Sequence, residues 1–476
     1  MKKYKVVVAL LWGFALVGCK ISKPLPDDPQ FVSPKQFSAQ DTLREVVLPK
    51  DLLTRDTLLV RLIDSTLERN LDLQLLNQQV ARMAAQMRLV RGIDRPDLMA
   101  GLTQGQRRFG KYTMDGVGNF DTNFSPNLTP DQKVPHPHLP DYLIGVQSSW
   151  EIDVWGKLKS TKKAALHRWF ASQAGQRLFK TQLVAEVASL YYQLVLLREE
   201  QTMLRENILL QERALDLVRV MKQAGEANEL GVELLAAQLL SSQATLTNVQ
   251  QIVNETQLTL NGLAGRFPQE ILTNGMPPES LEGVQWSVGT PASLLRNRPD
   301  IVQAEEELRA SKADVDAARL AFLPAVNISA NLGFQAFRAA LWFNPASIAY
   351  QLVGGVAAPL LNRRVLESQL LMSRADQQAA YIRYKQVILT SFQEVNQFQS
   401  RALNLQEQVQ LKKQEVELLR RSISTSTDLF LSGRATYLEV ITAQKNALQA
   451  QIELIDLQRN WATALAQLYR SLGGGW

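Results

Sequence analysis

The sequence predicts a mainly α-helical protein with a small β part and an internal duplication. Three observations predict this fold class. No proline, the strongest helix breaker, occurs between Pro140 and Pro268 or after Pro359. Four segments of about ten residues alternate apolar with polar or small residues, which is the period of a strand. The same order of helical and alternating segments occurs twice along the chain.

The composition excludes several function classes. The chain has 476 residues, of which 46% are hydrophobic and 21% charged, as in ordinary folded proteins. A single cysteine excludes an intramolecular disulfide, and three histidines leave little for a metal centre or a histidine-based active site. Of the formal charge of +6, three units come from Lys2, Lys3 and Lys5. No basic stripe remains, so no nucleic-acid partner is expected.

The N-terminus predicts a targeting signal over residues 1–18. A basic start precedes the apolar stretch Val6–Gly18, which is too short to span a bilayer and right for a signal-peptide core. The stretch ends Leu-Val-Gly before Cys19, which resembles a bacterial lipobox. That resemblance implies cleavage before Cys19 and its acylation, for example by palmitate. An ordinary signal peptide with a chance cysteine is the alternative.

The start of the mature chain predicts a tether. Residues 19–50 contain five prolines and read as an extended segment behind the lipid. Several acyl chains on Cys19 give stable anchoring to a membrane. The next residue is Lys20, where an aspartate would indicate retention in the inner membrane of some bacteria, so the outer membrane is favoured. No later stretch approaches 18 apolar residues, so a membrane crossing by the mature chain requires β-strands.

Helical periodicity covers most of the remaining chain. Residues 52–91 predict one or two helices. Residues 157–224 predict one continuous helix about 100 Å long, at 1.5 Å per residue. Its apolar residues follow heptad spacing, with Gln201 and Gln211 interrupting. They are Leu183, Val187, Leu190, Leu194, Leu197, Leu204, Ile208, Leu215 and Val218. Such a helix does not fit a compact core and must pack side by side with others.

Two glycines predict helical hairpins. Each proline-free stretch is broken once, at Gly225 and at Gly433, within the shared pattern Gly-x-Ala-x-x-Leu-x-Val. Glycine at a helix end takes the left-handed conformation that lets the chain reverse. We therefore expect two hairpins, whose tips lie near positions 225 and 433.

The alternating segments predict four strands. They cover residues 99–107, 142–152, 325–334 and 348–356. In the clearest, Val326, Ile328 and Leu332 share one face opposite asparagines and serines, whereas the first is inferred by symmetry. Each has the length of a transmembrane strand. A soluble four-stranded sheet is the alternative that alternation alone allows.

The two halves predict two structural repeats, residues 51–290 and 291–476. Each reads as helix, strand pair and helical hairpin, and the tips are 208 residues apart. Four strands cannot close a barrel alone, and an open sheet edge is not tolerated in lipid. The geometry therefore predicts a barrel shared between protomers. Three copies supply twelve strands, enough to leave an aqueous lumen.

Several stretches resemble the TolC family of outer-membrane factors, in particular NodT-like lipoproteins of RND-type efflux systems. They are residues 294–301, with the Arg-Pro-Asp signature at Arg298, residues 321–325, residues 150–156 and the second tip from Gly433 to Gln444. The resemblance covers the mature chain. It implies a homotrimer with a twelve-stranded outer-membrane barrel, four strands from each chain, that continues into a long periplasmic α-helical barrel.

The resemblance also implies a function. The protein would be a passive exit duct for small molecules such as drugs, not an enzyme and without a cofactor. It would dock onto a periplasmic adaptor protein bound to an inner-membrane RND-type pump. Two alternatives stay open: a duct for protein secretion, and a coiled-coil lipoprotein tether that is not a channel. The sequence does not name the cargo.

Family members often place acidic side chains around the aperture, just past the second tip. The matching position is Glu439, where the family usually has Asp, and a second acidic position is Thr442 here. A ring of three carboxylates attracts cations and repels itself. Glu439 is therefore the gate candidate. The alternative is an ordinary solvated charge on a helix surface.

The tips are the candidates for adaptor contact. The residues are Gly225, Ala227 and Leu230 in the first tip and Gly433, Ala435 and Leu438 in the second. Small and apolar side chains at a hairpin end suit end-on helical packing. The alternative is that they pack the two arms of each hairpin together. No metal site is expected, because His136 and His138 lie in a loop without a neighbouring ligand cluster.

Overall fold

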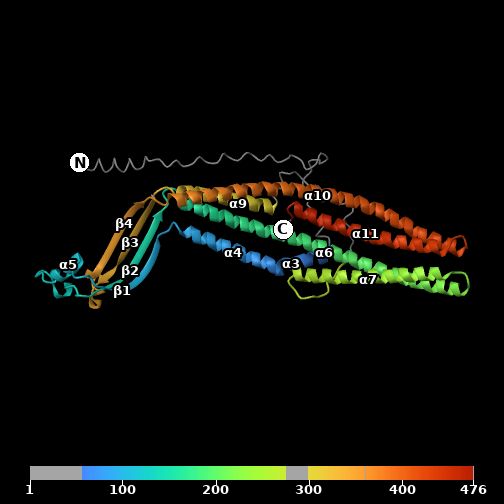
Figure 1. The fold of residues 1–476 in the computed structure, drawn as a ribbon, viewed down its shortest axis with the longest axis horizontal. Helices are drawn as coiled ribbons and strands as arrows, with labels where there is room; N and C mark the ends of the chain where they lie inside the picture. Colours follow the sequence, from blue (N-terminus) through green and yellow to red (C-terminus); the bar gives the residue numbers. More distant parts are fainter. Residues whose placement is uncertain (1–55, 275–297, 360, 475–476) are drawn as a thin grey trace. The chain divides into compact units, whose positions relative to one another are not determined.

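A computed structural model describes residues 56–274, 298–359 and 361–474 (Figure 1). The predicted signal peptide, the tether and Cys19 lie outside the described residues. The long elements are α3 (Thr57–Arg69), α4 (Leu71–Gly92), β1 (Asp97–Arg107), α5 (Met114–Thr122), β2 (Leu139–Ile152), α6 (Lys157–Gln223), α7 (Glu229–Leu263), α9 (Pro299–Leu320), β3 (Ala325–Ala336), β4 (Ile348–Ala357), α10 (Arg363–Leu431) and α11 (Tyr437–Ser471). Short 3₁₀ turns lie at Pro130–Gln132, Ala339–Leu341 and Pro345–Ser347.

The chain divides into two compact units. Among the described residues, the first unit takes 83–169, 307–359 and 361–380, and the second takes 56–82, 170–274, 298–306 and 381–474. Each unit thus draws residues from both halves of the chain. The predicted repeats, 51–290 and 291–476, are a division by sequence order and remain a prediction.

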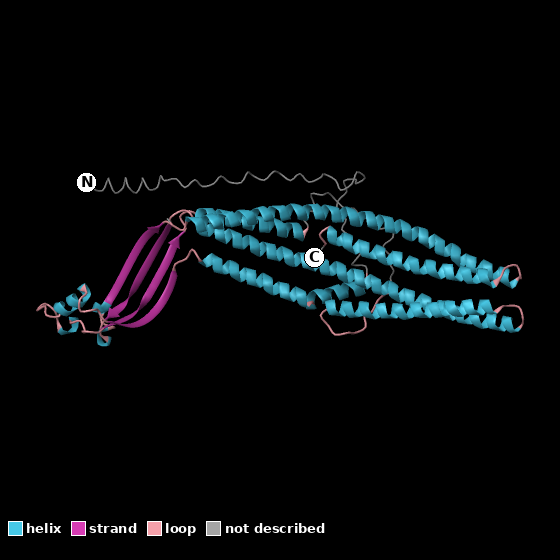
Figure 2. Ribbon diagram, viewed as in Figure 1, coloured by secondary structure: helices cyan, strands magenta, loops and turns pink. Residues whose placement is uncertain are grey.

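The first unit contains one antiparallel sheet in the order β1-β2-β3-β4 (Figure 2). All four predicted strands are present, three predicted from alternation and the first by symmetry, and the structure extends them by a few residues. The link between β1 and β2 is long and carries α5, whereas β3 and β4 are joined by a short link with two 3₁₀ turns. Among the described residues, no helix combines the length and the apolar character needed to span a membrane.

The predicted helical segment 52–91 forms two helices because of Asn70. Its backbone N–H makes the last helical hydrogen bond of α3, to the carbonyl of Thr66 at 2.8 Å, and its ψ of 125° then ends the helix. Its side-chain Oδ1 accepts from the backbone N–H of Leu73 at 2.8 Å, which caps the start of α4. Asparagine is favoured at helix starts for this reason.

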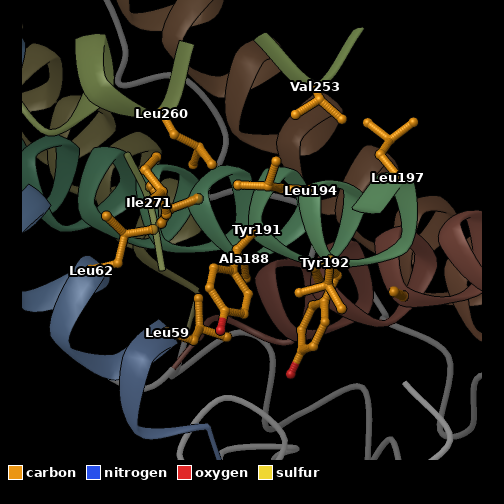
Figure 3. Close-up of a cluster of buried hydrophobic side chains, with 14 of the residues drawn as sticks. Leu59, Leu62, Ala188, Tyr191, Tyr192, Leu194, Leu197, Val253, Leu260 and Ile271 are labelled. Atoms are coloured by element: carbon orange, nitrogen blue, oxygen red, sulfur yellow. The ribbon is translucent and has the colours of Figure 1, made fainter. Parts of the chain in front are cut away.

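The predicted long helix is confirmed as α6, which has 67 residues. The predicted heptad residues form its buried seam, where Leu194 and Leu204 are fully buried. The seam joins the main core of the second unit, which also receives side chains from α3, α7 and α11 (Figure 3). Of the two interrupting glutamines, Gln211 is buried and Gln201 only partly so.

The duplication is visible in the lengths of corresponding elements. Helices α4 and α9 both have 22 residues, and α7 and α11 both have 35. The long helices α6 and α10 have 67 and 69 residues. Each half of the chain thus contributes one helix of 22 residues, two strands and one hairpin of a long and a shorter helix.

Candidate functional site

The two hairpin tips have the same backbone turn. Gly225 has φ +83° and Gly433 has φ +70°. After α6, the N–H of Glu226 donates to the carbonyl of Met221 at 2.9 Å. After α10, the N–H of Arg434 donates to the carbonyl of Leu429 at the same distance. Both tips are therefore Schellman turns, which need a left-handed residue and select glycine.

Both tips expose the leucine of the shared pattern to solvent, and the second tip also exposes Leu431. Leu230 is 60% exposed and Leu438 is 59% exposed. The alanines of the shared pattern, Ala227 and Ala435, are half-buried. Each tip therefore offers a leucine at its surface, whereas its alanine packs partly inward.

A groove of about 760 Å³ lies between the tips. Residues of both hairpins line it, and they include Ala227, Leu230, Ala435 and Leu438. Next to the groove, Ile441 of α11 packs into a cluster with Val218 and Leu235 of the first hairpin. All six residues predicted for adaptor contact thus lie at the tips, and this small apolar cluster joins the two hairpins there.

Glu439 lies in the first turn of α11 and is exposed. Its carboxylate accepts a hydrogen bond from the hydroxyl of Thr436, the residue that precedes the helix. That hydrogen bond, together with the backbone N–H of Glu439, holds the pKa of the carboxyl below its usual value of 4.5. Glu439 therefore carries its negative charge at neutral and mildly acidic pH. Thr442 stands at the second position that is often acidic in the family, and its hydroxyl donates to the carbonyl of Leu438 at 2.8 Å.

The two tips differ in the side-chain contact that joins the two helices of the hairpin. In the first tip, the ammonium of Lys222 pairs with the carboxylate of Glu229. In the second, the rings of Phe430 and Tyr437 meet edge to face, with centroids 5.1 Å apart. These four positions correspond at the 208-residue offset of the tips. Neither contact was predicted, although aligning the two halves at the tip glycines places the pairs opposite each other.

The sheet has one apolar and one polar face. The strand register places Val146 beside Leu332, and Leu332 beside Tyr350. Exposed large apolar side chains on this face are Leu98, Leu102, Leu332, Leu352 and Val356, each at least 55% exposed. The opposite face carries mainly amides, hydroxyls, glycines and ionisable groups, and also the apolar Met99, Leu143 and Val353. Such a two-faced sheet is typical of a wall between an apolar and an aqueous environment.

Aromatic rings lie at both ends of the apolar face. At the loop end, Tyr142 contacts Trp342 with ring centroids 5.5 Å apart, and Trp342 stacks on Phe343 at 5.6 Å. At the helix end, the indole N–H of Trp150 donates to the carbonyl of Asp94 at 2.8 Å. Tyr142 and Trp150 lie eight residues apart on one strand, or about 27 Å. Aromatic girdles flank the apolar band of transmembrane barrels at about this spacing.

Comparison with known proteins identifies the family. The model of the family "Outer membrane efflux protein" matches residues 62–266 and 290–474. The chain is 32% identical over 336 residues to the pyoverdine export outer membrane protein OpmQ of Pseudomonas aeruginosa, with 70% of each chain covered. It is 26% identical over 473 residues to the probable outer membrane lipoprotein SilC of Salmonella typhimurium, with 97% of each covered.

The fold is that of solved outer-membrane channels. The outer-membrane channel OprN superimposes with a TM-score of 0.83 at 23% identity, over 96% of this chain and 99% of that one. The family match, the 32% identical relative and the shared fold agree. The chain therefore belongs to the family of outer membrane efflux proteins and is an outer-membrane efflux channel.

Proposed function

We propose that this chain forms, as a homotrimer, the exit duct of a tripartite efflux system. One observation carries the proposal: a four-stranded sheet with an exposed apolar face and a polar face belongs to the same chain as two hairpins with matched tips. The first feature suits a shared wall in the outer membrane. The second suits docking of a partner at the hairpin ends.

The sheet argument leads to three copies. In the order β1-β2-β3-β4, the outer edges of β1 and β4 have no partner strand within the described chain. Unpaired backbone groups cost several kcal/mol each in lipid, so these edges need another copy. Three copies give twelve strands with the apolar faces toward lipid and the polar faces toward an aqueous lumen.

The tips fit a helical partner. Leu230 and Leu438 are exposed, and the groove between the tips has apolar walls. We propose that a periplasmic adaptor protein packs against these leucines and connects the duct to an inner-membrane RND-type pump. Gly225 and Gly433 shape the turns that present them. The gate role of Glu439 is part of the same proposal, because three copies bring three carboxylates to the hairpin ends.

The cargo we propose is a small molecule loaded by the pump. The relative OpmQ is named for pyoverdine export, and this supports a small-molecule cargo over a secreted protein. A passive duct needs neither a cofactor nor catalysis. Acylation of Cys19 is proposed as the anchor, and the name of SilC as a probable lipoprotein supports it.

The first experiment is the mass of the detergent-solubilised protein by light scattering, followed by conductance in planar bilayers. A trimer that conducts is expected. A monomer that stays folded, or a trimer without conductance, contradicts the proposal. Docking is then tested with Leu230→Asp and Leu438→Asp combined. We expect this variant to remain a conducting trimer but to lose efflux in cells. The control is Gln243→Asp, at an exposed site of α7 farther from the tip, which should keep both the conductance and the efflux.

A further inference from the structure

Three amides lie side by side on the polar face of the sheet. Gln147 of β2 is the register partner of Asn331 in β3, and Asn331 is the partner of Gln351 in β4. The side-chain N–H of Asn331 donates to Oε1 of Gln351 at 3.3 Å, and all three residues are exposed. The row continues on β1 with the exposed Met99, the register partner of Gln147. We refer to Gln147, Asn331 and Gln351 as the amide row.

The neighbouring row toward the loops has almost no side chains. It consists of Gly101, Gly145, Gly333 and Ala349, which are register partners in that order. A Cβ on Gly145 would lie 2.5 Å from the carbonyl oxygen of Leu332, and one on Gly333 would lie 2.4 Å from that of Ile144. Larger residues cannot replace these two glycines without moving the backbone. The amides therefore project beyond their neighbours on this side.

The row on the other side of the amides is also short. It contains the register partners Ser149 and Ser329, flanked by Asp97 and Val353. Adjacent rows are about 6.8 Å apart along a strand. The amides are thus the longest side chains on β2 and β3 in the middle of the polar face.

Ionisable groups on this face lie outside the amide row and the glycine row, and the nearest of them, Asp97, lies in the serine row next to the amides. On the helix side they are Asp97 and Glu151, and Glu151 pairs with Lys157 at 2.5 Å. On the loop side they are Asp141 and Arg107, and Asp141 accepts from the amide of Gln335 at 3.0 Å. The glycine row and the amide row carry no ionisable side chain. A molecule at this level of the face meets the three amides and the thioether of Met99, without a fixed charge.

We infer that the amide row is the selectivity-determining wall of the strand-lined part of the duct. This inference rests on the proposed trimer, in which three rows place nine amides at one level of the lumen. An amide offers both donors and acceptors, so it replaces water around polar groups of either type. The row therefore admits polar and hydrogen-bonding cargo whatever the sign of its charge. Sorting by charge falls to other levels of the duct.

The test uses the scarcity of cysteine. Cys19 is the only cysteine, and it is the proposed acylation site, so a new cysteine offers a single reactive thiol. Asn331→Cys is folded, assembled as the trimer and inserted into a planar bilayer. It is then treated with a negatively or a positively charged methanethiosulfonate reagent. The charge is thus added after folding. Reversal potentials are measured in a potassium chloride gradient.

Opposite shifts are expected: the negative adduct favours cations and the positive adduct favours anions, with lower conductance for both. The matched control is Leu332→Cys, the next residue on the apolar face, where neither reagent should alter the current. Adducts at Asn331→Cys that leave current and selectivity unchanged overturn the inference. So does an equal effect at Leu332→Cys. Absence of any channel in the untreated wild type instead contradicts the proposed function itself.

A second variant tests whether the amides narrow the strand-lined part of the duct. Replacing all three by alanine should raise the single-channel conductance of the trimer, because the neighbouring rows are already short. Asn331→Gln, which keeps the amide, should leave the reversal potential unchanged. A triple alanine variant with wild-type conductance would mean that the amides do not narrow the strand-lined part of the duct, and it overturns this part of the inference.

Discussion

The guanidinium of Arg298 donates to the backbone carbonyl of Ser471 at 2.8 Å. The corresponding contact in the first half runs from the amide of Asn70 to the carbonyl of Leu263 at 2.9 Å. Both donors directly precede a helix of 22 residues, and both acceptors end a helix of 35 residues. The duplication thus extends to single hydrogen bonds, although the donor residue types differ.

Loss of Arg298 should destabilise the second unit strongly. The buried guanidinium also pairs with Asp300 at 2.6 Å and with Glu394 at 2.8 Å. Burial lowers the pKa of Arg298, and the two carboxylates more than offset this, so its pKa lies above its usual value. Arg298→Ala removes the guanidinium from Asp300 and leaves Glu394 with Arg470, at 3.3 Å, as its remaining cation, and it should cost about 3–5 kcal/mol. Urea unfolding measures this, with the smaller loss of Asn70→Ala, about 1–3 kcal/mol, for comparison.

Alkaline pH should weaken the contact between α3 and α6. The hydroxyl of Tyr191 donates to the buried carboxylate of Asp56 at 2.6 Å. Burial, followed by this hydrogen bond, raises the pKa of Tyr191, and burial raises that of Tyr192 to about 12. Because the protonated phenols are favoured in the folded state, their contribution is complete below pH 10 and decreases as the pH rises toward 12.

Thermal unfolding between pH 8 and pH 12 tests the role of Tyr191. Tyr191→Phe should cost about 1–3 kcal/mol near neutral pH, because Asp56 loses a buried partner. The variant should also show a smaller alkaline decrease than the wild type. An identical alkaline decrease in both proteins would mean that Tyr191 does not contribute to it.

The two tips should respond differently to salt. The pair of Lys222 and Glu229 is largely exposed and is worth about 0–1 kcal/mol, which salt screens. The ring pair of Phe430 and Tyr437 is worth about 0.5–1.5 kcal/mol beyond its buried area and does not depend on charge. Hydrogen exchange at both tips, in low and high salt, should show faster opening with salt only at the first. Phe430→Ala should accelerate exchange at the second tip in either condition.

Neutralising Glu439 should reduce the cation preference of the channel. Glu439→Gln removes the charge and keeps the shape, and reversal potentials in a salt gradient measure the effect. Because its pKa is lowered by the Thr436 hydroxyl, the wild-type preference should persist at pH 4.5 and disappear as the pH falls further. Glu233→Gln, an exposed acid on α7, is the matched control. Equal effects of both variants would remove the gate assignment.

The aromatic rings should lie at defined depths in the bilayer. Trp342 contacts Tyr142 at the loop end of the apolar face. In vesicles with brominated lipids, we expect bromines near the headgroups to quench the fluorescence of Trp342 more strongly than bromines near the chain ends. Trp342→Phe should remove this depth-dependent part of the fluorescence. Trp461→Phe, a buried tryptophan of α11, should not change this depth dependence. Equal quenching from all depths in wild type and Trp342→Phe would contradict contact with lipid at this ring.

The sequence by itself determined the element types and their order. Alternation with period two predicted three strands, and the symmetry of the two halves predicted the first. The heptad residues predicted the buried seam of α6. Both periods are local properties of the chain. The tip glycines were also readable, since a left-handed turn restricts the residue type. Family membership followed from stretches such as the one that contains Arg298.

Only the tertiary structure decided which distant side chains meet. The alignment of Gln147 with Asn331 and Gln351 depends on strand register, and a shift of one residue would move all three to the other face. The contacts of Arg298 with Ser471 and of Tyr191 with Asp56 join residues 173 and 135 positions apart. Neither periodicity nor composition encodes such relationships, because they arise when helices and strands pack.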